Sequence, residues 1–487
     1  MRSLLVLTLG LWFAAPAAAQ SLGETSFDNS GSEDAQEPFL RGLLLLHSFE
    51  YVDARDAFRE AQAIDPSFAM AYWGEAMTHN HPIWMRQDRD AAHDALARME
   101  ANLVAITPRE RDYLRTLEFL FGEPGDDTYD KETRDDRYAV AMRALAENHP
   151  EDLDAAAFYA LSLLGTAHEG RDFTTYMKAA AVAEEVFAEN PRHPGAAHYL
   201  IHAYDDPVHA PLGLRAARVY DQIAPDASHA LHMPSHIYLA LGMWNGTRDM
   251  NQRSYDAALA ATDRRGEALN GHGWHALWWW HYATTQTDQR ALADSLVAVA
   301  MEHATEQPSR TASANATRLL AQHALAFDDP ATIRAWSDPM ETTGLSTEAV
   351  RLHALGLVAL ADGDTEAAHA ALESLEMQID EVADPEDVRW YIRAAAMSLS
   401  AALHHHEGDP ETALVLLQEA AALETAAPLT FGPPAPTVPA NESLGYLHLE
   451  LGDSEAATAA FQASLDRAPN RRQSVDGMAR ARRSVGG

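Results

Sequence analysis

Cysteine is absent from all 487 residues of the sequence. Its absence excludes disulfide bonds, thiolate metal ligands, a cysteine nucleophile and a lipid-modified N-terminal cysteine. Any metal site in this chain must therefore be built from histidine, aspartate and glutamate.

Positive charge is also scarce. Lys131 and Lys178 are the only lysines, and 36 basic residues stand against 72 acidic ones, which gives a formal net charge of −36. The acidic residues are spread along the whole chain. Because such a surface repels nucleic acid and anionic lipid, we expect no nucleic-acid partner and interpret the charge as solvated acidic surface.

Long hydrophobic runs are missing, since no segment reaches the roughly 18 consecutive apolar residues of a membrane span. Residues 1–19 have the layout of a secretory signal peptide: Arg2, an apolar stretch, then small residues up to Ala19. The sequence predicts a soluble periplasmic or secreted protein without membrane insertion, whose mature chain begins near Gln20. Residues 20–37 are polar and acidic, which predicts a flexible leader.

Strand patterns are absent, and helix-favouring residues dominate the periodic segments. Small residues, a Phe and a closing Pro recur at the offsets of the tetratricopeptide repeat, a 34-residue pair of antiparallel helices. One copy has Gly445, Gly452, Ala457, Phe461 and Pro469, and another has Gly42, Ala54, Phe58, Ala61 and Pro66. The chain thus resembles the tetratricopeptide superfamily.

We therefore predict an all-α fold, a right-handed α-α superhelix that runs as one continuous solenoid over residues 38–482. A proline-rich segment, residues 427–440, interrupts it before the last repeat. We interpret this segment as an ordered or semi-rigid crossing loop, with a lid over the groove as the alternative.

Two His-x-x-x-His pairs stand one repeat apart. His198 and His202 precede His232 and His236 by 34 residues. At about 100° per residue the first pair shares a helix face with Asp205, away from the apolar face. The family resemblance implies that these positions face the concave groove. Pro234 lies inside the second pair, so that helix either begins near Pro234 or is kinked there.

Histidines four residues apart on one helix face can bind a divalent ion, and adjacent helices can bring two pairs to a shared site. We therefore name His198, His202, Asp205, His232 and His236 as candidate ligands for a divalent metal, Zn, Cu or Ni, with Asp205 as a ligand or as an acceptor that fixes a histidine tautomer. The alternative is that these histidines bridge neighbouring helices by hydrogen bonds. Tyr199 and Met233 occupy the place of the Glu in a His-Glu-x-x-His protease motif, which disfavours that mechanism.

The same repeat count adds polar and aromatic residues to the groove. These candidate binding residues are Asn80, His81, His209, His275, Trp278 and Tyr282. Of three consecutive tryptophans, Trp278 is the one expected in the groove, and Trp279 and Trp280 are expected in the core or at an interface.

Three stretches, AMAYWGEAMTHNHPIW, HPGAAHYLIHAYDDPVHAPLGLRAA and HMPSHIYLALGMW, resemble a more particular group of exported bacterial tetratricopeptide proteins. That resemblance implies architecture and no reaction. The first interpretation is an exported scaffold whose concave groove binds a peptide or partner protein. The second is a metal-binding or metal-dependent hydrolytic protein, and the third a metal-free small-molecule or glycan site at Trp278 and Tyr282. Convergence of the imidazoles favours the second, and separated histidines in an open groove favour the first.

Overall fold

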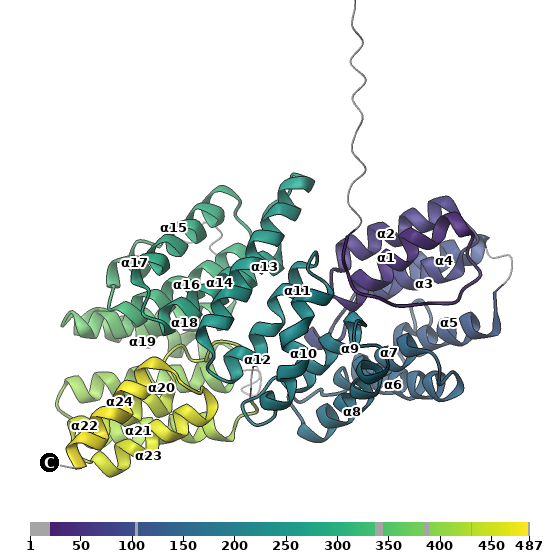
Figure 1. Ribbon diagram of the computed structural model, residues 1–487. Coiled ribbons are helices and arrows are strands. Elements are labelled where there is room, and N and C mark those ends of the chain that lie inside the picture. Colours follow the sequence, from purple (N-terminus) through teal and green to yellow (C-terminus); the bar gives the residue numbers. More distant parts are fainter. Residues whose placement is uncertain (1–19, 103–105, 337–343, 383–388, 430, 486–487) are drawn as a thin grey trace, which may run out of the picture.

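The computed structural model describes residues 20–102, 106–336, 344–382, 389–429 and 431–485, and the predicted signal peptide lies outside them. The described chain is mainly helical with almost no strand, which confirms the all-α superhelix (Figure 1). Its first half contains η1 (Glu33–Ala35), α1 (Gln36–His47), α2 (Tyr51–Ile64), α3 (Ala69–Met77), β1 (Asn80–His81), η2 (Pro82–Trp84), β2 (Arg86–Gln87), α4 (Arg89–Asn102), α5 (Pro108–Phe121), α6 (Lys131–Asn148), α7 (Leu153–Leu164), α8 (Phe173–Glu189), α9 (Pro194–Ala203), α10 (Ala210–Ile223), α11 (Ser228–His232) and α12 (Pro234–Ala240).

The second half continues the array of helix pairs. It contains α13 (Trp244–Arg265), α14 (Gly271–Gln286), α15 (Arg290–Glu306), α16 (Arg310–Phe327), α17 (Pro330–Arg334), α18 (Leu345–Ala361), α19 (Thr365–Asp380), α20 (Trp390–His406), α21 (Pro410–Ala426), α22 (Ala440–Glu450), α23 (Ser454–Arg467) and α24 (Arg472–Val485). β1 and β2 form a two-stranded antiparallel hairpin in which Asn80 pairs with Gln87. Over the described residues no helix is long and apolar enough to span a bilayer.

Glycines in the repeat signature make room for an aromatic ring. A Cβ atom on Gly42 would lie 2.9 Å from Phe58, and one on Gly74 would lie 2.4 Å from it. Gly445 and Gly477 flank Phe461 in the same way, at 2.7 and 2.3 Å. The recurring Gly and Phe positions therefore let three successive helices close on one ring.

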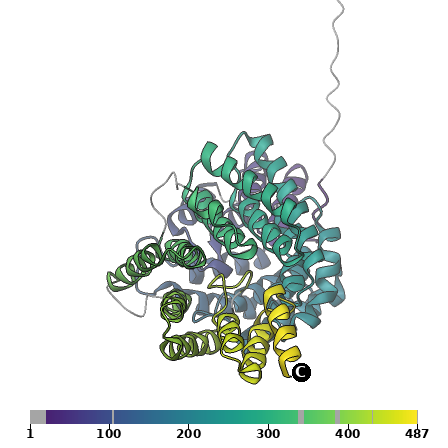
Figure 2. The same ribbon diagram turned by 90° about the vertical axis from the view of Figure 1, so that its left-hand side faces the viewer.

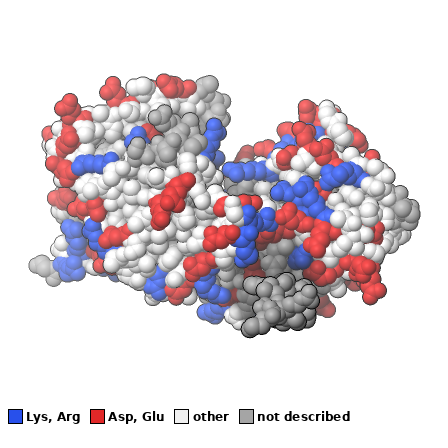
Figure 3. All heavy atoms as spheres, turned by 90° about the horizontal axis from the view of Figure 1, so that it is seen from above, with Lys and Arg blue, Asp and Glu red and all other residues white. Residues whose placement is uncertain are grey.

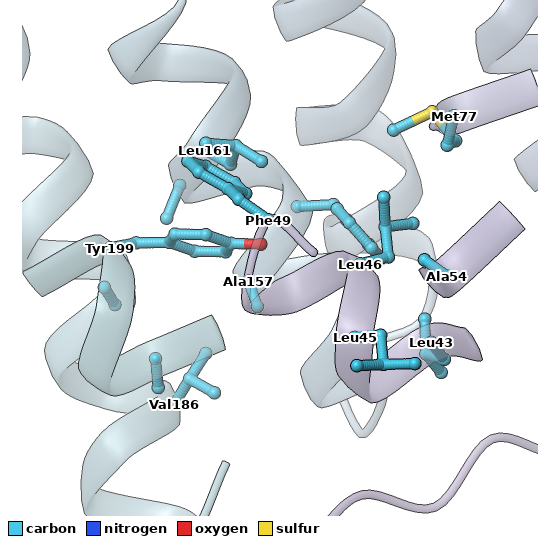
Figure 4. Close-up of a cluster of buried hydrophobic side chains, with 14 of the residues drawn as sticks. Leu43, Leu45, Leu46, Phe49, Ala54, Met77, Ala157, Leu161, Val186 and Tyr199 are labelled. Atoms are coloured by element: carbon cyan, nitrogen blue, oxygen red, sulfur yellow. The ribbon is translucent and has the colours of Figure 1, made fainter. Parts of the chain in front are cut away.

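The first half of the chain closes on itself. The C-terminal end of α1 packs against α7 and α9, and Phe49 lies with Leu161 and Tyr199 in a buried apolar cluster (Figure 4). The His47 side chain, at the end of α1, lies beside this cluster, and its Nδ1 is 2.9 Å from the Tyr199 hydroxyl. This closure brings α1 beside the helix that carries His198 and His202.

The second half also closes, as Figures 1 and 2 show for α22–α24 beside α12–α14. Trp244 Nε1 donates to the Asn470 carbonyl at 2.8 Å, and Arg471 donates to the Tyr282 hydroxyl at 3.3 Å. An ion pair of Arg265 with Asp53 links α13 to α2 of the first half. The single solenoid predicted from the repeats is thus folded into two closed turns. In the first turn α1 closes on α7 and α9, and in the second turn α22–α24 close on α12–α14. The two turns meet along α9–α14.

Residues 20–32 are packed against the first turn. Leu22 and Phe27 are buried, and the Phe27 ring contacts Phe39, Trp73 and Tyr113. The Ser30 amide also donates to Glu110 Oε1 at 2.8 Å. The prediction of a flexible leader does not hold for this segment, because two apolar side chains in its polar sequence anchor it as an extended strap.

Charged side chains are distributed over both closed turns. Acidic side chains are spread across the face seen in Figure 3 and basic ones lie among them, with no single acidic patch on that face. The distribution agrees with the interpretation of the net charge of −36 as solvated surface.

Candidate functional site

A group of three buried histidines lies where the two turns meet. His198 and His202 come from α9, and His229 comes from α11, the first helix of the next pair. One ring nitrogen from each lies within 4.8 Å of the others. The Nε2 atoms of all three are buried and have no hydrogen-bond partner among the described residues. Buried polar atoms are normally satisfied, so these three imidazoles form a candidate ligand set.

The tautomer of His198 is fixed by the end of α1. Its Nδ1 lies 2.7 Å from the backbone carbonyl oxygen of His47. Because a carbonyl only accepts, Nδ1 carries the proton and Nε2 presents a lone pair toward the other two histidines. On the far side, Nδ1 of His229 lies 3.1 Å from Nδ1 of His272 on α14. Such outer contacts orient imidazole ligands in metal sites.

A second group of three histidines follows directly. His232 ends α11, His236 lies in α12 and His275 in α14, again with ligand atoms within 4.8 Å of one another. His232 Nδ1 lies 2.6 Å from Asn251 Oδ1, and His236 Nδ1 lies 2.6 Å from Asp205 Oδ2. Their Nε2 atoms are 2.9 Å apart.

Pro234 lies between the first two histidines of this group. Pro234 has no backbone N–H, and the helix is interrupted at Met233 between α11 and α12. Of the two alternatives drawn from the sequence, the structure has the helix that begins at Pro234, with Met233 before it and His232 as the last residue of α11. The ring centroids of His232 and His236 are 4.8 Å apart, the same distance as those of His198 and His202 on the continuous helix α9.

Both groups border a cleft of about 450 Å³. His202 and His229 of the first group and His236 and His275 of the second line it. Its other walls come from α2, the β1–β2 hairpin, α13, α14 and the proline-rich segment; they include Glu50, Tyr51, Trp84, Arg265, Trp279 and Phe431. A molecule in the cleft would therefore meet both histidine groups.

Burial favours the neutral form of His198, His202, His229, His232 and His275. Desolvation lowers the pKa of His198 and of His275 to about 3 each, from the ordinary 6.5. It also lowers the pKa values of His202, His229 and His232 well below 6.5, and neighbouring histidines add to the effect. The neutral form is the one that binds a metal ion.

The structure distributes the predicted ligands differently from the sequence prediction. His198 and His202 do not share one four-histidine group with His232 and His236; each pair gains a third histidine and forms its own group. The groups are still neighbours, because the ring centroids of His202 and His236 are 5.8 Å apart. Asp205 lies behind His236 as a hydrogen-bond acceptor, which is the second of the two roles considered for it.

The predicted binding residues separate into two sets. His81 and His275 line the cleft, and His81 stacks on Tyr51 at 3.9 Å. Among the described residues that line the cleft, Asn80, His209, Trp278 and Tyr282 do not occur. Trp279 takes the place expected for Trp278, because it follows His275 by one helical turn and packs 4.5 Å from His236.

His229 and His272 were missed by the sequence reasoning. The signal for His229 was present, since it precedes His232 by three residues and therefore shares its helix face. His272 precedes the predicted His275 by the same spacing. A search for all histidines at spacings of three and four would have found both.

A third cluster, formed by His47, Asp154 and His193, is a hydrogen-bonded network. Asp154 Oδ1 lies 2.8 Å from His47 Nε2 and 3.3 Å from His193 Nε2. The second ring nitrogens are also used, by the Tyr199 hydroxyl and by the Ala196 amide. Burial would raise the pKa of Asp154, but the two histidines hold it well below its usual range. His193 Nε2 lies at ion-pair distance from Asp154 but makes no hydrogen bond among the described residues, and the cluster joins α1, α7 and the N-terminus of α9.

Comparison with known proteins adds little about function. The sequence matches no protein-family model and no curated protein. The crystal structure of the APC/C hetero-tetramer Cut9–Hcn1 is similar over 93% of this chain and 78% of that chain, with 13% identity and a TM-score of 0.37. The crystal structure of yeast Tom70 is similar over 93% of this chain and 89% of that chain, with 11% identity and a TM-score of 0.38. The crystal structure of the P58(IPK) TPR domain is similar over 93% of this chain and 98% of that chain, with 13% identity and a TM-score of 0.22. At these TM-scores the function must be argued from this chain's own side chains.

Proposed function

We propose that this chain is a divalent-metal-binding helical-repeat protein in which His198, His202 and His229 hold an ion. Two observations carry the proposal: one ring nitrogen of each of the three histidines lies within 4.8 Å of the others, and the three buried Nε2 atoms have no hydrogen-bond partner among the described residues. Leaving three such atoms unpaired costs about 1–3 kcal/mol each. An ion bound to all three removes that cost.

The ligand set selects the class of metal. Three imidazoles suit zinc, copper or nickel and do not suit calcium or magnesium, which prefer oxygen ligands. Three protein ligands also leave a coordination position open, as in catalytic rather than structural zinc sites. Because His202 and His229 line the cleft, that position is available to water or to a cleft ligand. The proposal therefore includes metal-assisted hydrolysis as a reaction class, in which the ion lowers the pKa of bound water.

The test is metal loading of untagged protein. Chains stripped with chelator are exposed separately to zinc, copper and nickel, desalted and analysed for bound metal. His202→Ala and His229→Ala should each lose one equivalent while the helical spectrum persists. His353→Ala is the matched control, because His353 Nε2 is also buried and unpaired among the described residues, yet His353 belongs to no described histidine group. Wild-type protein that retains none of the three metals would overturn the proposal.

Peptide or partner-protein binding is the second candidate, and exposed apolar side chains at the cleft favour it. Trp84 is 43% and Phe431 41% exposed, and both line the cleft. A peptide side chain that enters between them would bury this surface. Selection from a peptide library supports this function if Trp84→Ala abolishes the binding of selected peptides and Val140→Ala, on α6 away from the cleft, does not. Peptides that bind both variants equally would contradict it.

The proposal places the protein outside the cytoplasm, in the periplasm or secreted, on the basis of residues 1–19. Mass spectrometry of the N-terminal peptide from the producing cells tests it. A mature N-terminus near Gln20 supports export, and a retained residue 1 in the cytoplasmic fraction contradicts it.

A further inference from the structure

We infer that His232, His236 and His275 hold a second divalent ion beside the first, so that the cleft carries a pair of ions. The inference rests on the proposed function. The observation that starts it is the 2.9 Å separation of two Nε2 atoms, those of His232 and His236, which lies within hydrogen-bonding range.

Neither of these two nitrogens carries a proton when both rings are neutral. Nδ1 of His236 faces the Asp205 carboxylate at 2.6 Å, and a carboxylate only accepts. Nδ1 of His232 faces Asn251 Oδ1 at 2.6 Å. The Asn251 amide nitrogen donates to the Thr247 carbonyl at 2.7 Å, which fixes the oxygen toward His232. Both Nδ1 atoms therefore hold the proton, and two lone pairs face each other.

Two lone pairs at this distance repel unless a cation lies between or beside them. Nitrogens held about 2.05 Å from one ion are about 2.9 Å apart at a right angle, and about 3.3 Å apart in a tetrahedron. The observed 2.9 Å fits the right angle. Right-angled nitrogen ligands are typical of tetragonal Cu²⁺ and Ni²⁺. His275, with its ring 4.7 Å from that of His232, supplies the third nitrogen.

The outer contacts of this group are those of a metal centre. A carboxylate behind one ligand and an amide oxygen behind another fix the tautomers and raise the basicity of the Nε2 atoms. Asp205 and Asn251 come from two different elements, the turn after α9 and the helix α13. The Trp279 ring packs against all three histidines, at 4.8, 4.5 and 5.1 Å from His232, His236 and His275, and closes the apolar side.

The two groups are close enough for their ions to act together. His202 and His236 have ring centroids 5.8 Å apart, and His229 and His232 have theirs 5.9 Å apart. Each ion has three protein ligands, and both groups line one cleft. The remaining coordination positions can therefore be filled by one oxygen-donor ligand that bridges the pair, as in two-metal sites.

A proton is the competing occupant of the space between His232 and His236. Protonation of Nε2 on His236 would give an imidazolium paired with Asp205 and hydrogen-bonded to His232. This arrangement predicts a single bound ion per chain, at the first group alone. The number of ions per chain therefore distinguishes it from the inferred pair.

The test uses full-length mature protein titrated with CuCl₂. His404, His405 and His406 at the end of α20 are replaced by glutamine in every sample, because this surface run can bind copper independently. We expect two equivalents of copper per chain and an electron paramagnetic resonance signal reduced or broadened by coupling between the two ions. His275→Ala and His232→Ala should each bind one equivalent and restore the full signal of an isolated Cu²⁺. His281→Ala, a buried histidine outside both groups, should keep both ions.

The outcomes separate the two proposals. One equivalent in the parent protein, unchanged in His275→Ala and lost in His202→Ala, would overturn the inference and leave the proposed function standing. No retained copper, zinc or nickel would overturn both. If His275→Ala does not fold, His236→Gln provides the same comparison, since glutamine keeps most of the volume and removes the nitrogen ligand.

Discussion

Asp205 accepts a hydrogen bond from Nδ1 of His236 at 2.6 Å, although the two residues belong to successive repeats. Asp205 lies two residues after Ala203, the last residue of α9, and His236 lies in α12. Both side chains are buried, so the pair is shielded from solvent screening. The contact couples the turn after the first histidine group to a ligand of the second group.

Asp205→Asn should weaken binding of the second ion by about 10–100-fold, the usual effect of losing a carboxylate behind a histidine ligand. Titration against a chromophoric chelator measures the two affinities. Asp221→Asn is the control, because Asp221 forms an ion pair with Arg253 at 2.5 Å and is not among the described residues that line the cleft. Equal affinities in the two variants would mean that Asp205 does not support a ligand.

Phe27→Ala should destabilise the first turn by about 3–5 kcal/mol, the range for removing a buried phenylalanine. The ring contacts three aromatic side chains and lies 4.1 Å from the Arg109 guanidinium. Urea unfolding followed by tryptophan fluorescence measures the loss. Phe431→Ala, at a partly exposed ring, should change stability far less. If Phe27→Ala unfolds at the same urea concentration as the wild-type protein, residues 20–32 do not contribute to its stability.

Acid should destabilise the metal-free protein from about pH 6.5 downward. Burial lowers the pKa of His353 to about 4 and that of His281 to about 3, whereas the unfolded chain has the ordinary 6.5. Below pH 6.5 the unfolded state therefore binds more protons than the folded state, and the free energy of unfolding falls as pH decreases toward the folded pKa.

Between pH 6.5 and 4, His353→Leu should reduce the slope of the free energy of unfolding against pH by about 1.4 kcal/mol per pH unit. This is the contribution of one proton that the unfolded state binds and the folded state does not. Chemical unfolding at several pH values, with chelator present, gives the slope. His369→Leu, at an exposed residue, is the control. An unchanged slope in His353→Leu would mean that His353 is protonated in the folded protein.

The sequence predicted the repeat architecture well because its signals are local. Gly42, Ala54 and Phe58 lie within one helix pair, and their spacing alone indicates the close approach of helices that Phe58 fills. The closure of the second turn depends instead on contacts such as Arg471 with Tyr282, which are separated by 189 residues. No repeat pattern specifies such a contact, so the two closed turns could not be predicted.

The candidate site was predicted in part for the same reason. The four histidines at equal repeat positions were identified from spacing, and the structure brings all four to one cleft region. Their division into two groups depends on the third member of each, His229 or His275, and His275 comes from a later repeat, which is a tertiary feature. The leader was mispredicted because its average composition conceals Leu22 and Phe27.

Arg471→Met should open the closure of the second turn. Arg471 forms a buried ion pair with Glu442 at 2.8 Å and also donates to Tyr282. Removal of one partner leaves a buried carboxylate, which costs about 3–5 kcal/mol. The double variant Arg471→Met with Glu442→Gln should recover part of that loss. Thermal unfolding measures both, and a single variant as stable as wild type would contradict the role given to this pair.

X-ray absorption at the metal edge of zinc-loaded or copper-loaded protein tests the central claim most directly, because it reports the ligand atoms themselves. We predict nitrogen scatterers at about 2.0–2.1 Å with the outer-shell pattern of imidazole rings, close to three per ion. His202→Ala should lower the imidazole number measured for the first ion. An oxygen-only first shell without imidazole scattering, or a spectrum unchanged by His202→Ala, would contradict the assignment of these histidines as the metal ligands.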